Sequence, residues 1–263
     1  MTSDGAYVPD QDWHKEGERL AAIEQLWDPG TRASIEALGI EPGWRCLEVG
    51  AGAGSIAAWL AEKVAPDGDV LATDLSTRHL DGLFAPNLEV REHDILNDPL
   101  PRARFDLVHA RCVVEHLGRR ALERMLPSLR PGGWLVLEAH DWAGAGSYPE
   151  RRPLERAIEA ELGLLTRSGF DRHYGRKLAH ELETSGLVDI GAVGHVHIAR
   201  GAGPATAFLR LTLESLAPAL LAAGDLTQRD VDLALANVDD PDTAFLSAPM
   251  ITAWGRNHQP RTE

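Results

Sequence analysis

Glycine and acidic residues near position 50 have a spacing that suits the binding of a nucleoside. Gly50, Gly52 and Gly54 alternate with alanines, Glu48 stands two positions before the first of them, and Asp74 follows the last by 20 residues. Glycines let a backbone approach a ligand because no Cβ intervenes, and a helix that starts after them offers free N–H groups. A carboxylate about 20 residues further on suits a ribose diol. We expect a nucleoside-binding turn here, and the alternative is a turn that only packs a helix against a sheet.

The residues around this turn predict the elements that position it. Residues 44–49 form a short apolar run, residues 55–64 show helical periodicity, and residues 69–73 form a second apolar run that ends at Asp74. The order is strand, tight turn, helix and strand. The glycines would then lie at the end of the first strand, and Asp74 at the end of its neighbour.

The glycine pattern favours one class of nucleoside over another. A dinucleotide-binding turn requires glycine at the position of Ser55, whereas here the third glycine comes one residue early, at Gly54. The pattern Glu-x-Gly-x-Gly-x-Gly from Glu48 resembles the first motif of class I S-adenosylmethionine-dependent methyltransferases. A second resemblance to this family is the Leu-x-Pro-Gly-Gly turn in residues 129–133, which precedes an apolar run. The resemblance is specific over residues 44–140 and only topological beyond them.

This resemblance implies an α/β fold, a cofactor and a set of binding residues. The fold is a doubly wound, mostly parallel, seven-stranded Rossmann-like sheet, and S-adenosylmethionine is the cofactor, with S-adenosylhomocysteine as product. In the family the glycine turn holds the methionine part, the acid at Asp74 binds the ribose, and Asp94 with Ile95 contacts the adenine. The cofactor-binding residues predicted in this way are Tyr7, Glu48, Gly50, Ala51, Gly52, Ser55, Asp74, Leu75, Asp94, Ile95, Ala110 and Arg111.

Four further polar residues follow the predicted fourth and fifth strands. Glu115 and His116 come shortly after the apolar run 105–110, and His140 and Asp141 come directly after the run 134–139. The carboxyl ends of parallel strands meet at the crevice where open α/β sheets bind ligands. A general base is needed only if the nucleophile holds its proton tightly, and histidine suits this role because of its pKa near neutrality. These four residues are the catalytic candidates, and the alternative is that they orient neighbours or face solvent.

The rest of the chain is predicted to cover this crevice. Residues 1–40 are interpreted as an N-terminal arm and helical lid, with two helices separated at Asp28-Pro29-Gly30, and residues 41–263 as the methyltransferase domain. Tyr7, Trp13 and Trp27 are lid candidates, although Trp27 is equally suited to the core. Segments 142–185 and 200–243 are predicted to form extra helices, after the fifth and sixth strands, that cover a substrate. They suit a homodimer interface equally well.

Smaller elements are also predicted. Residues 77–84 suggest a short helix, and residues 187–198 a sixth strand. Residues 244–254 suggest a last, antiparallel strand. Pro249 interrupts it and favours an edge position or a bulge, because proline cannot donate to a strand ladder.

Composition bears on partners and metals. The formal charge of −14 repels phosphate backbones and anionic membranes, so neither nucleic acid nor membrane is an expected partner, and Arg151, Arg152 and Arg156 are interpreted as a solvated surface. No apolar run approaches membrane-spanning length, and the two cysteines lie in apolar surroundings, so a reducing cytoplasm is the expected location. His195 and His197 lack a third ligand nearby, so no metal is predicted.

The acceptor is predicted from what the chain lacks. After the fourth strand stands Ala110-Arg111-Cys112-Val113, not the Asn/Asp-Pro-Pro-Tyr/Phe sequence of enzymes that methylate nucleic-acid bases. The acidic set of magnesium-dependent catechol enzymes is also missing. We therefore expect a small organic acceptor, such as a secondary metabolite, methylated on oxygen or carbon and less readily on nitrogen. Two alternatives stay open: a protein that uses the sulfonium without transferring its methyl group, for example in a cyclisation or rearrangement, and a nicotinamide-dependent dehydrogenase.

Overall fold

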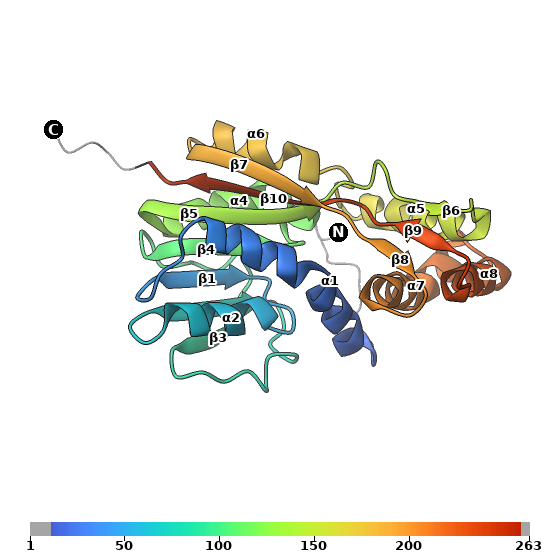
Figure 1. The fold of residues 1–263 in the computed structure, drawn as a ribbon, viewed down its shortest axis with the longest axis horizontal. Coiled ribbons are helices and arrows are strands. Elements are labelled where there is room, and N and C mark those ends of the chain that lie inside the picture. Colours follow the sequence, from blue (N-terminus) through green and yellow to red (C-terminus); the bar gives the residue numbers. More distant parts are fainter. Residues whose placement is uncertain (1–11, 259–263) are drawn as a thin grey trace.

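The protein is built on one central sheet of seven strands, as a computed structural model that describes residues 12–258 shows (Figure 1). The strand order is β3-β2-β1-β4-β5-β10-β7, and β10 is antiparallel to both of its neighbours. The strands are β1 (Arg45–Val49), β2 (Asp69–Asp74), β3 (Leu88–Glu92), β4 (Phe105–Arg111), β5 (Leu129–His140), β7 (Val188–His195) and β10 (Met250–Arg256). The predicted doubly wound, mostly parallel sheet is confirmed.

Helices cover both faces of this sheet because its strands are apolar on both sides. The described helices are α1 (Glu16–Ala37), α2 (Ser55–Val64), α3 (Val114–Leu117), α4 (Arg119–Met125), α5 (Arg152–Arg167), α6 (Leu178–Thr184), α7 (Pro204–Ala223) and α8 (Gln228–Asp239), with 3-10 turns η1 (Leu126–Ser128) and η2 (Gly175–Lys177). Ile35 of α1 and Leu60 of α2 belong to the core on one face, and Leu122 of α4 and Leu182 of α6 to the core on the other. This layering leaves the carboxyl ends of the parallel strands uncovered by α2, α4 and α6.

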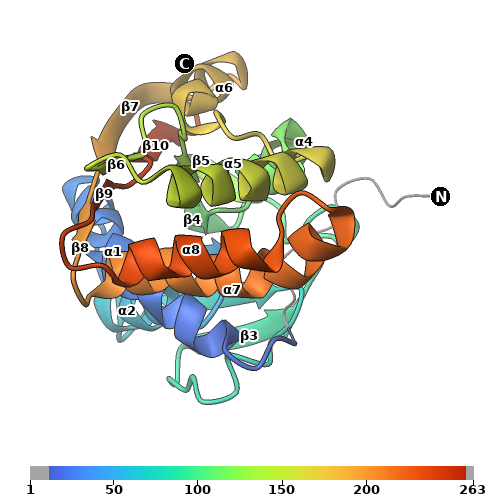
Figure 2. The ribbon, with the colours of Figure 1, turned by 90° about the vertical axis from the view of Figure 1, so that its right-hand side faces the viewer.

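A second layer of structure closes that end of the sheet. Helices α5, α7 and α8 stack across it (Figure 2), beside a small antiparallel sheet in which β9 (Ala244–Leu246) pairs with β6 (Gly146–Tyr148) and β8 (Ile198–Arg200). Phe245 and Ala199 of this sheet pack with Leu154 and Ile158 of α5. The predicted helices in segments 142–185 and 200–243 are thus present, whereas the small sheet was not predicted.

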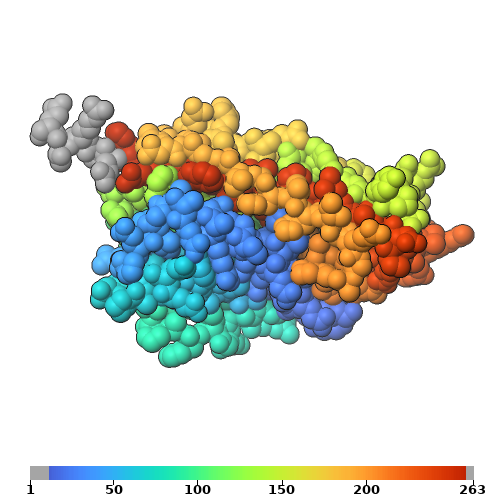
Figure 3. All heavy atoms as spheres, viewed as in Figure 1, coloured from blue at the N-terminus to red at the C-terminus, as the bar shows by residue number. Residues whose placement is uncertain are grey.

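The N-terminal segment forms one helix where two were predicted. Helix α1 runs through Pro29, although a proline removes one hydrogen bond and crowds the preceding turn. Trp27 and Ile35, on either side of Pro29, are buried with 2% and 0% of their surface exposed. Burial of these side chains against the sheet and α7 offsets the cost of the proline, which local sequence signals do not report. In the space-filling view α1 and α7 lie against each other (Figure 3).

Two other local predictions are wrong. Residues 77–84 form turns and no helix, with hydrogen bonds from Leu80 N to Thr77 O and from Leu83 N to Leu80 O. Gly82 within the segment and Pro86 just after it both disfavour a helix. Strand β10 is central, since β5 and β7 flank it. Pro249 is accommodated because it falls in the break where the chain leaves β9 in one sheet and enters β10 in the other.

Helix α7 corrects the prediction that no stretch approaches membrane-spanning length. Its residues Pro204–Ala223 are long and apolar enough to cross a membrane by length and composition alone, which for a single helix is weak evidence of a span. Leu213, Leu216 and Leu220 of α7 are buried in a core shared with α5 and α8. Its apolar character is thus partly explained by packing within the protein.

Candidate functional site

The glycine turn joins β1 to α2 in left-handed backbone conformations. Gly50, Gly52 and Gly54 have φ angles of 72°, 60° and 91°, which L side chains rarely adopt. The N–H of Gly50 donates to Thr73 O at 2.8 Å, so the turn is held to the end of β2. A Cβ on Gly52 would approach the side chain of Leu20 in α1 at 3.5 Å. The left-handed backbone therefore requires glycine at these positions, whereas a Cβ on Gly52 would make only an ordinary van der Waals contact with Leu20.

Asp74 lies beside this turn, at the end of β2. Its Oδ2 accepts a hydrogen bond from Gly52 N at 2.9 Å, and its Oδ1 accepts one from Ser76 N at 3.3 Å. Burial raises the pKa of Asp74, and the backbone donors partly oppose that rise. Asp94, at the next strand end, accepts from Leu96 N at 2.8 Å, and hydrogen bonds lower its pKa although burial opposes them. Two carboxylates thus line one edge of a cavity.

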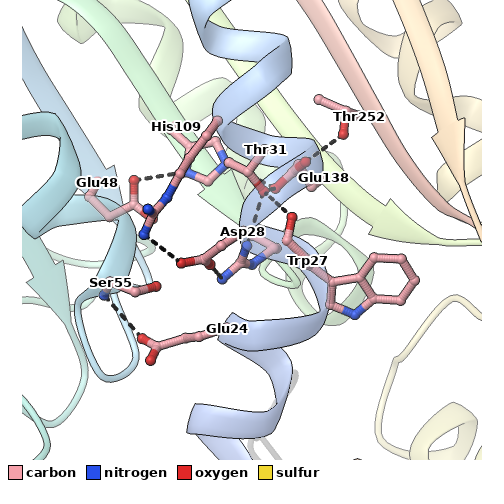
Figure 4. A network of polar contacts seen from close by, with 11 residues as sticks. Glu24, Trp27, Asp28, Thr31, Glu48, Ser55, His109, Glu138 and Thr252 are labelled. Carbon is pink, nitrogen blue, oxygen red and sulfur yellow. Dashed lines mark hydrogen bonds and ion pairs between the residues drawn. The ribbon is translucent and has the colours of Figure 1, made fainter. Parts of the chain in front are cut away.

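A buried polar network lies under the turn, across three strands (Figure 4). His109 of β4 lies between two carboxylates, with Nδ1 2.7 Å from Glu48 Oε2 and Nε2 3.2 Å from Glu138 Oε2. All three side chains are nearly inaccessible to solvent. Burial alone would lower the pKa of His109, but the two carboxylates raise it to about 9. His109 is therefore an imidazolium at neutral pH, and burial is tolerated because its charge is compensated.

The same network attaches α1 to the sheet. Thr31 Oγ1 donates to Glu138 Oε2 at 2.5 Å and accepts from Arg111 NH1 at 3.0 Å, and Arg111 NH2 donates to Asp28 Oδ1 at 3.0 Å. Further along α1, Glu24 Oε1 accepts from Ser55 N at 3.0 Å, where α2 begins. A carboxylate at this position is favourable because the first N–H groups of a helix lack intrahelical partners. The contacts of these α1 residues make the helix a fixed wall.

A second buried polar cluster follows the ends of β4 and β5. His140 Nδ1 lies 3.2 Å from Glu115 Oε1 and 3.9 Å from Cys112 Sγ, and His140 N donates to Glu115 Oε2 at 2.6 Å. Burial alone would lower the pKa of His140, but the Glu115 carboxylate and Cys112 raise it to about 10. The potential ligand atoms of these three residues lie within 4.8 Å of one another, as a metal site would require. Both Glu115 oxygens, however, already accept from His140, so the cluster is explained without an ion.

One cavity of about 460 Å³ connects most of the predicted site residues. Those that line it are Glu48, Gly50, Ala51, Gly52, Ser55, Asp74, Leu75, Asp94, Ile95, Arg111, Glu115, His116 and His140. Ala110 is fully buried in the core behind it. Tyr7 lies outside the described residues. Cofactor and catalytic candidates are thus brought together, although they come from strand ends far apart in sequence.

Two of the remaining candidates point elsewhere. Asp141 is absent from the cavity lining and accepts hydrogen bonds from Arg176 and from His173 Nδ1, which lower its pKa although burial opposes them. Trp27 is buried beside His140 and does not line the main cavity, which agrees with the core alternative. The base role of Asp141 therefore receives no support from its position.

Sequence reasoning missed much of the cavity wall. Helix α1 contributes Arg19, whose guanidinium pairs with Glu16 at 2.6 Å, and helix α7 contributes Phe208 and Thr212. Trp142 also lines the cavity; it follows Asp141 directly, so its position after β5 was the signal that could have identified it. The α7 residues carry no such signal, because their helix reaches the cavity only through tertiary packing.

The basic residues 151, 152 and 156 each lie beside a carboxylate. Arg151 pairs with Asp240, Arg152 with Glu150 and Arg156 with Asp230. Each cation thus has a neighbouring carboxylate, as expected of a solvated surface.

The fold and the glycine-acid site resemble those of Rossmann-like methyltransferases. Residues 47–135 match the family described as "Methyltransferase domain". A relative, methyltransferase str2 of Strobilurus tenacellus, is 37% identical over 154 residues, which are 54% of this chain and 52% of the relative. The family match and this relative confirm the resemblance to the class I S-adenosylmethionine-dependent methyltransferases.

More distant similarities concern other parts of the family. The ubiquinone/menaquinone biosynthesis C-methyltransferase of Ectopseudomonas mendocina is 30% identical over 125 residues, 44% of this chain and 48% of the relative. Among solved structures, the chain superposes on geranyl diphosphate C-methyltransferase from Streptomyces coelicolor, in complex with geranyl diphosphate and S-adenosylhomocysteine. The TM-score is 0.53 and the sequence identity 13%, over 95% of this chain and 86% of that one. This identity supports the fold alone. The chain spans about half the length of the curated relatives it matches.

Proposed function

We propose that this protein transfers a methyl group from S-adenosylmethionine to a small organic acceptor, leaving S-adenosylhomocysteine. The observation that carries the proposal is the single cavity of about 460 Å³ that joins the glycine turn and Asp74 to the buried cluster around His140. A volume of this size suits ligand pockets, which are typically about 300–1,000 Å³. A donor and an acceptor would meet inside it without crossing bulk water.

The residues at the turn fit the proposed cofactor. Gly52 leaves its side of the turn without a Cβ, and the buried Ser55 Oγ has no hydrogen-bond partner among the described residues. We assign the ribose hydroxyls to Asp74 and the adenine to Asp94 and Ile95. When bound, the cofactor supplies an electrophilic methyl group on a sulfonium.

At the other end, the cavity is built to exclude water and to hold an apolar acceptor. The lining there is largely aromatic and aliphatic and includes Trp142, Leu165, Phe170, Phe208 and Leu216. These side chains come from segments 142–185 and 200–243, which we assign as the substrate cover, while residues 1–40 supply α1 as a further wall. Holding the reactants in line within a dry site accounts for much of the rate in a displacement of this kind.

We assign proton transfer in this site to His116 and His140, together with the Glu115 carboxylate. Glu115 orients His140 through both of its oxygens. Burial lowers the pKa of His116, which also lines the cavity, so this imidazole is neutral and able to accept a proton. His116 is therefore the better base, and Glu115 positions His140.

The relatives favour a small-molecule acceptor over a macromolecule. The curated relatives include C-methyltransferases of quinone biosynthesis, and the superposed geranyl diphosphate enzyme binds a small organic acceptor. We therefore retain oxygen or carbon of a secondary metabolite as the first choice of nucleophile and nitrogen as the next. A cytoplasmic enzyme without nucleic-acid or membrane partners, as a monomer or homodimer, is consistent with this chemistry.

Native mass spectrometry followed by a donor-consumption assay tests the proposal. The purified protein should release S-adenosylmethionine or S-adenosylhomocysteine on denaturation, and with methyl-labelled donor it should add the label to members of an acceptor panel. Release of a nicotinamide nucleotide would contradict the cofactor assignment. Turnover of an acceptor without gain of the label would instead favour use of the sulfonium without methyl transfer.

A further inference from the structure

A second, small cavity adjoins the main one and is lined by residues with three unpaired N–H groups. The volume of this cavity is about 10 Å³, near the space that one water molecule requires. Trp27 Nε1, Trp142 Nε1 and His140 Nε2 are shielded from solvent and have no hydrogen-bond partner among the described residues. The rest of the lining is almost entirely apolar: Leu26, Ala199, Ala205, Phe208, Leu209, Phe245, Ser247 and Ala248.

Aromatic packing holds these donors in place. The ring of His140 lies 5.6 Å from that of Trp27 at an interplanar angle of 74°, and 5.6 Å from that of Trp142. Phe208 stacks parallel to His140, with ring centroids 6.4 Å apart. His140, Trp142 and Phe208 line both cavities, so the two spaces adjoin at these side chains.

Charge favours an acceptor oxygen over any donor at this position. Glu115 and Cys112 face the Nδ1 side of His140, and they raise the pKa of this imidazole to about 10. His140 Nε2 therefore carries a proton at neutral pH, and the two indole nitrogens are donors only. Buried donors are rarely left unpaired, so three of them on residues that line one small space point to an acceptor atom there.

We propose that Trp27, His140 and Trp142 form a subsite for one anionic oxygen of the methyl acceptor. The acceptor is therefore an apolar molecule that carries a carboxylate, an acidic enol or a phenol. The oxygen occupies the small cavity, and the apolar body lies in the main cavity against Phe208 and Trp142. The inference rests on the proposed function, because it describes the substrate of that reaction. A neutral amide of the same shape lacks the charge that the imidazolium favours.

The test follows the indole N–H signals of the protein loaded with S-adenosylhomocysteine. The probes are formate, hydrocinnamate and the neutral hydrocinnamamide, and Trp27→Phe and Trp142→Phe assign the two signals in nitrogen-proton spectra. Trp59→Phe is the control, since this ring packs in α2 between Arg32 and Lys63, away from both cavities. We expect the acids, and not the amide, to shift the Trp27 and Trp142 signals downfield. Trp142→Phe should weaken hydrocinnamate binding about tenfold or more while the control leaves it unchanged.

Each result decides between distinct explanations. Unmoved signals with both acids, or equal affinity for acid and amide, overturn the subsite. Chloride is added as a further probe. If chloride shifts the indole signals and hydrocinnamate does not displace it, the subsite binds a free anion, and its assignment to the acceptor is overturned. Failure of S-adenosylhomocysteine itself to bind contradicts the proposed function, whereas normal cofactor binding with unmoved indole signals contradicts only this inference.

Discussion

The imidazolium of His109 makes a specific prediction about stability and pH. The residue lies between Glu48 and Glu138 and has a pKa of about 9 in the folded protein. In the unfolded chain its pKa is about 6.5. Because the folded pKa is the higher one, the stabilisation is complete below about pH 6.5 and is lost as the pH rises through about 9. We expect His109→Gln to remove this pH-dependent part of the free energy of unfolding.

The size of the effect follows from the two pKa values. A difference of about 2.5 units corresponds to about 3 kcal/mol of stability below pH 6.5, and linkage removes about 2 kcal/mol of it between pH 7 and pH 9. His140, whose pKa is raised to about 10, adds a decline of its own over the same range. That decline is common to wild type and variant, so the difference between their pH profiles reports His109 alone.

Urea unfolding at intervals from pH 6 to pH 10 measures these profiles. The matched control is His180→Gln, because His180 is exposed on α6. Its profile should run parallel to that of the wild type, while that of His109→Gln should be flatter by about 2 kcal/mol between pH 7 and pH 9. Parallel profiles for wild type and His109→Gln would show that His109 is neutral when folded, and the charge-compensated network would be refuted.

Three further predictions concern ligand binding. Asp74→Ala should weaken S-adenosylhomocysteine binding by about 1.5–3 kcal/mol in titration calorimetry, while Asp81→Ala, at an exposed position, should not; equal affinities would contradict the ribose assignment. Gly52→Val should nearly abolish binding, because a φ of 60° strains a branched side chain and that side chain would fill the space the ligand uses; a folded variant that binds normally would make the turn purely structural. Chelation by EDTA should leave turnover unchanged, because both Glu115 oxygens are already in use, and activity restored by added zinc would show a metal site.

The central sheet was predictable because its signals are local. Apolar runs bounded by glycine, proline and acidic residues marked the parallel strands, and the glycine turn after Val49 marked the start of α2. Helix α1 shows the limit of such signals: Pro29 and Gly30 indicate a stop, yet the helix continues because Trp27 and Ile35 are buried on either side. The unfavourable helix propensity of these residues is overcome because burial of the neighbouring side chains contributes more free energy.

The candidate site was predictable at the strand ends and not beyond them. Glu48 and Asp74 were selected by their spacing from the glycine turn and by the family resemblance, and His140 because parallel strands deliver their carboxyl ends to one edge. His109 lies inside a strand that reads as core, so nothing in its neighbours indicates that two carboxylates flank it. Phe208 reaches the cavity from a helix almost 70 residues after His140, a contact that only the packing of α7 determines.

The attachment of α1 to the sheet limits which segments can be exchanged with a related protein to make a chimera. A chimera cut at residues 47 and 135, the limits of the family match, would carry the cations His109 and Arg111 into the recipient. Their partners Asp28 and Glu138 would stay behind, one on each side of the cut. The recipient would bury Arg111 without Asp28, and His109 with only one of its two carboxylates, Glu48, which is unfavourable. The smallest exchangeable unit of this protein therefore begins before α1 and extends past β5, whatever boundaries sequence similarity suggests.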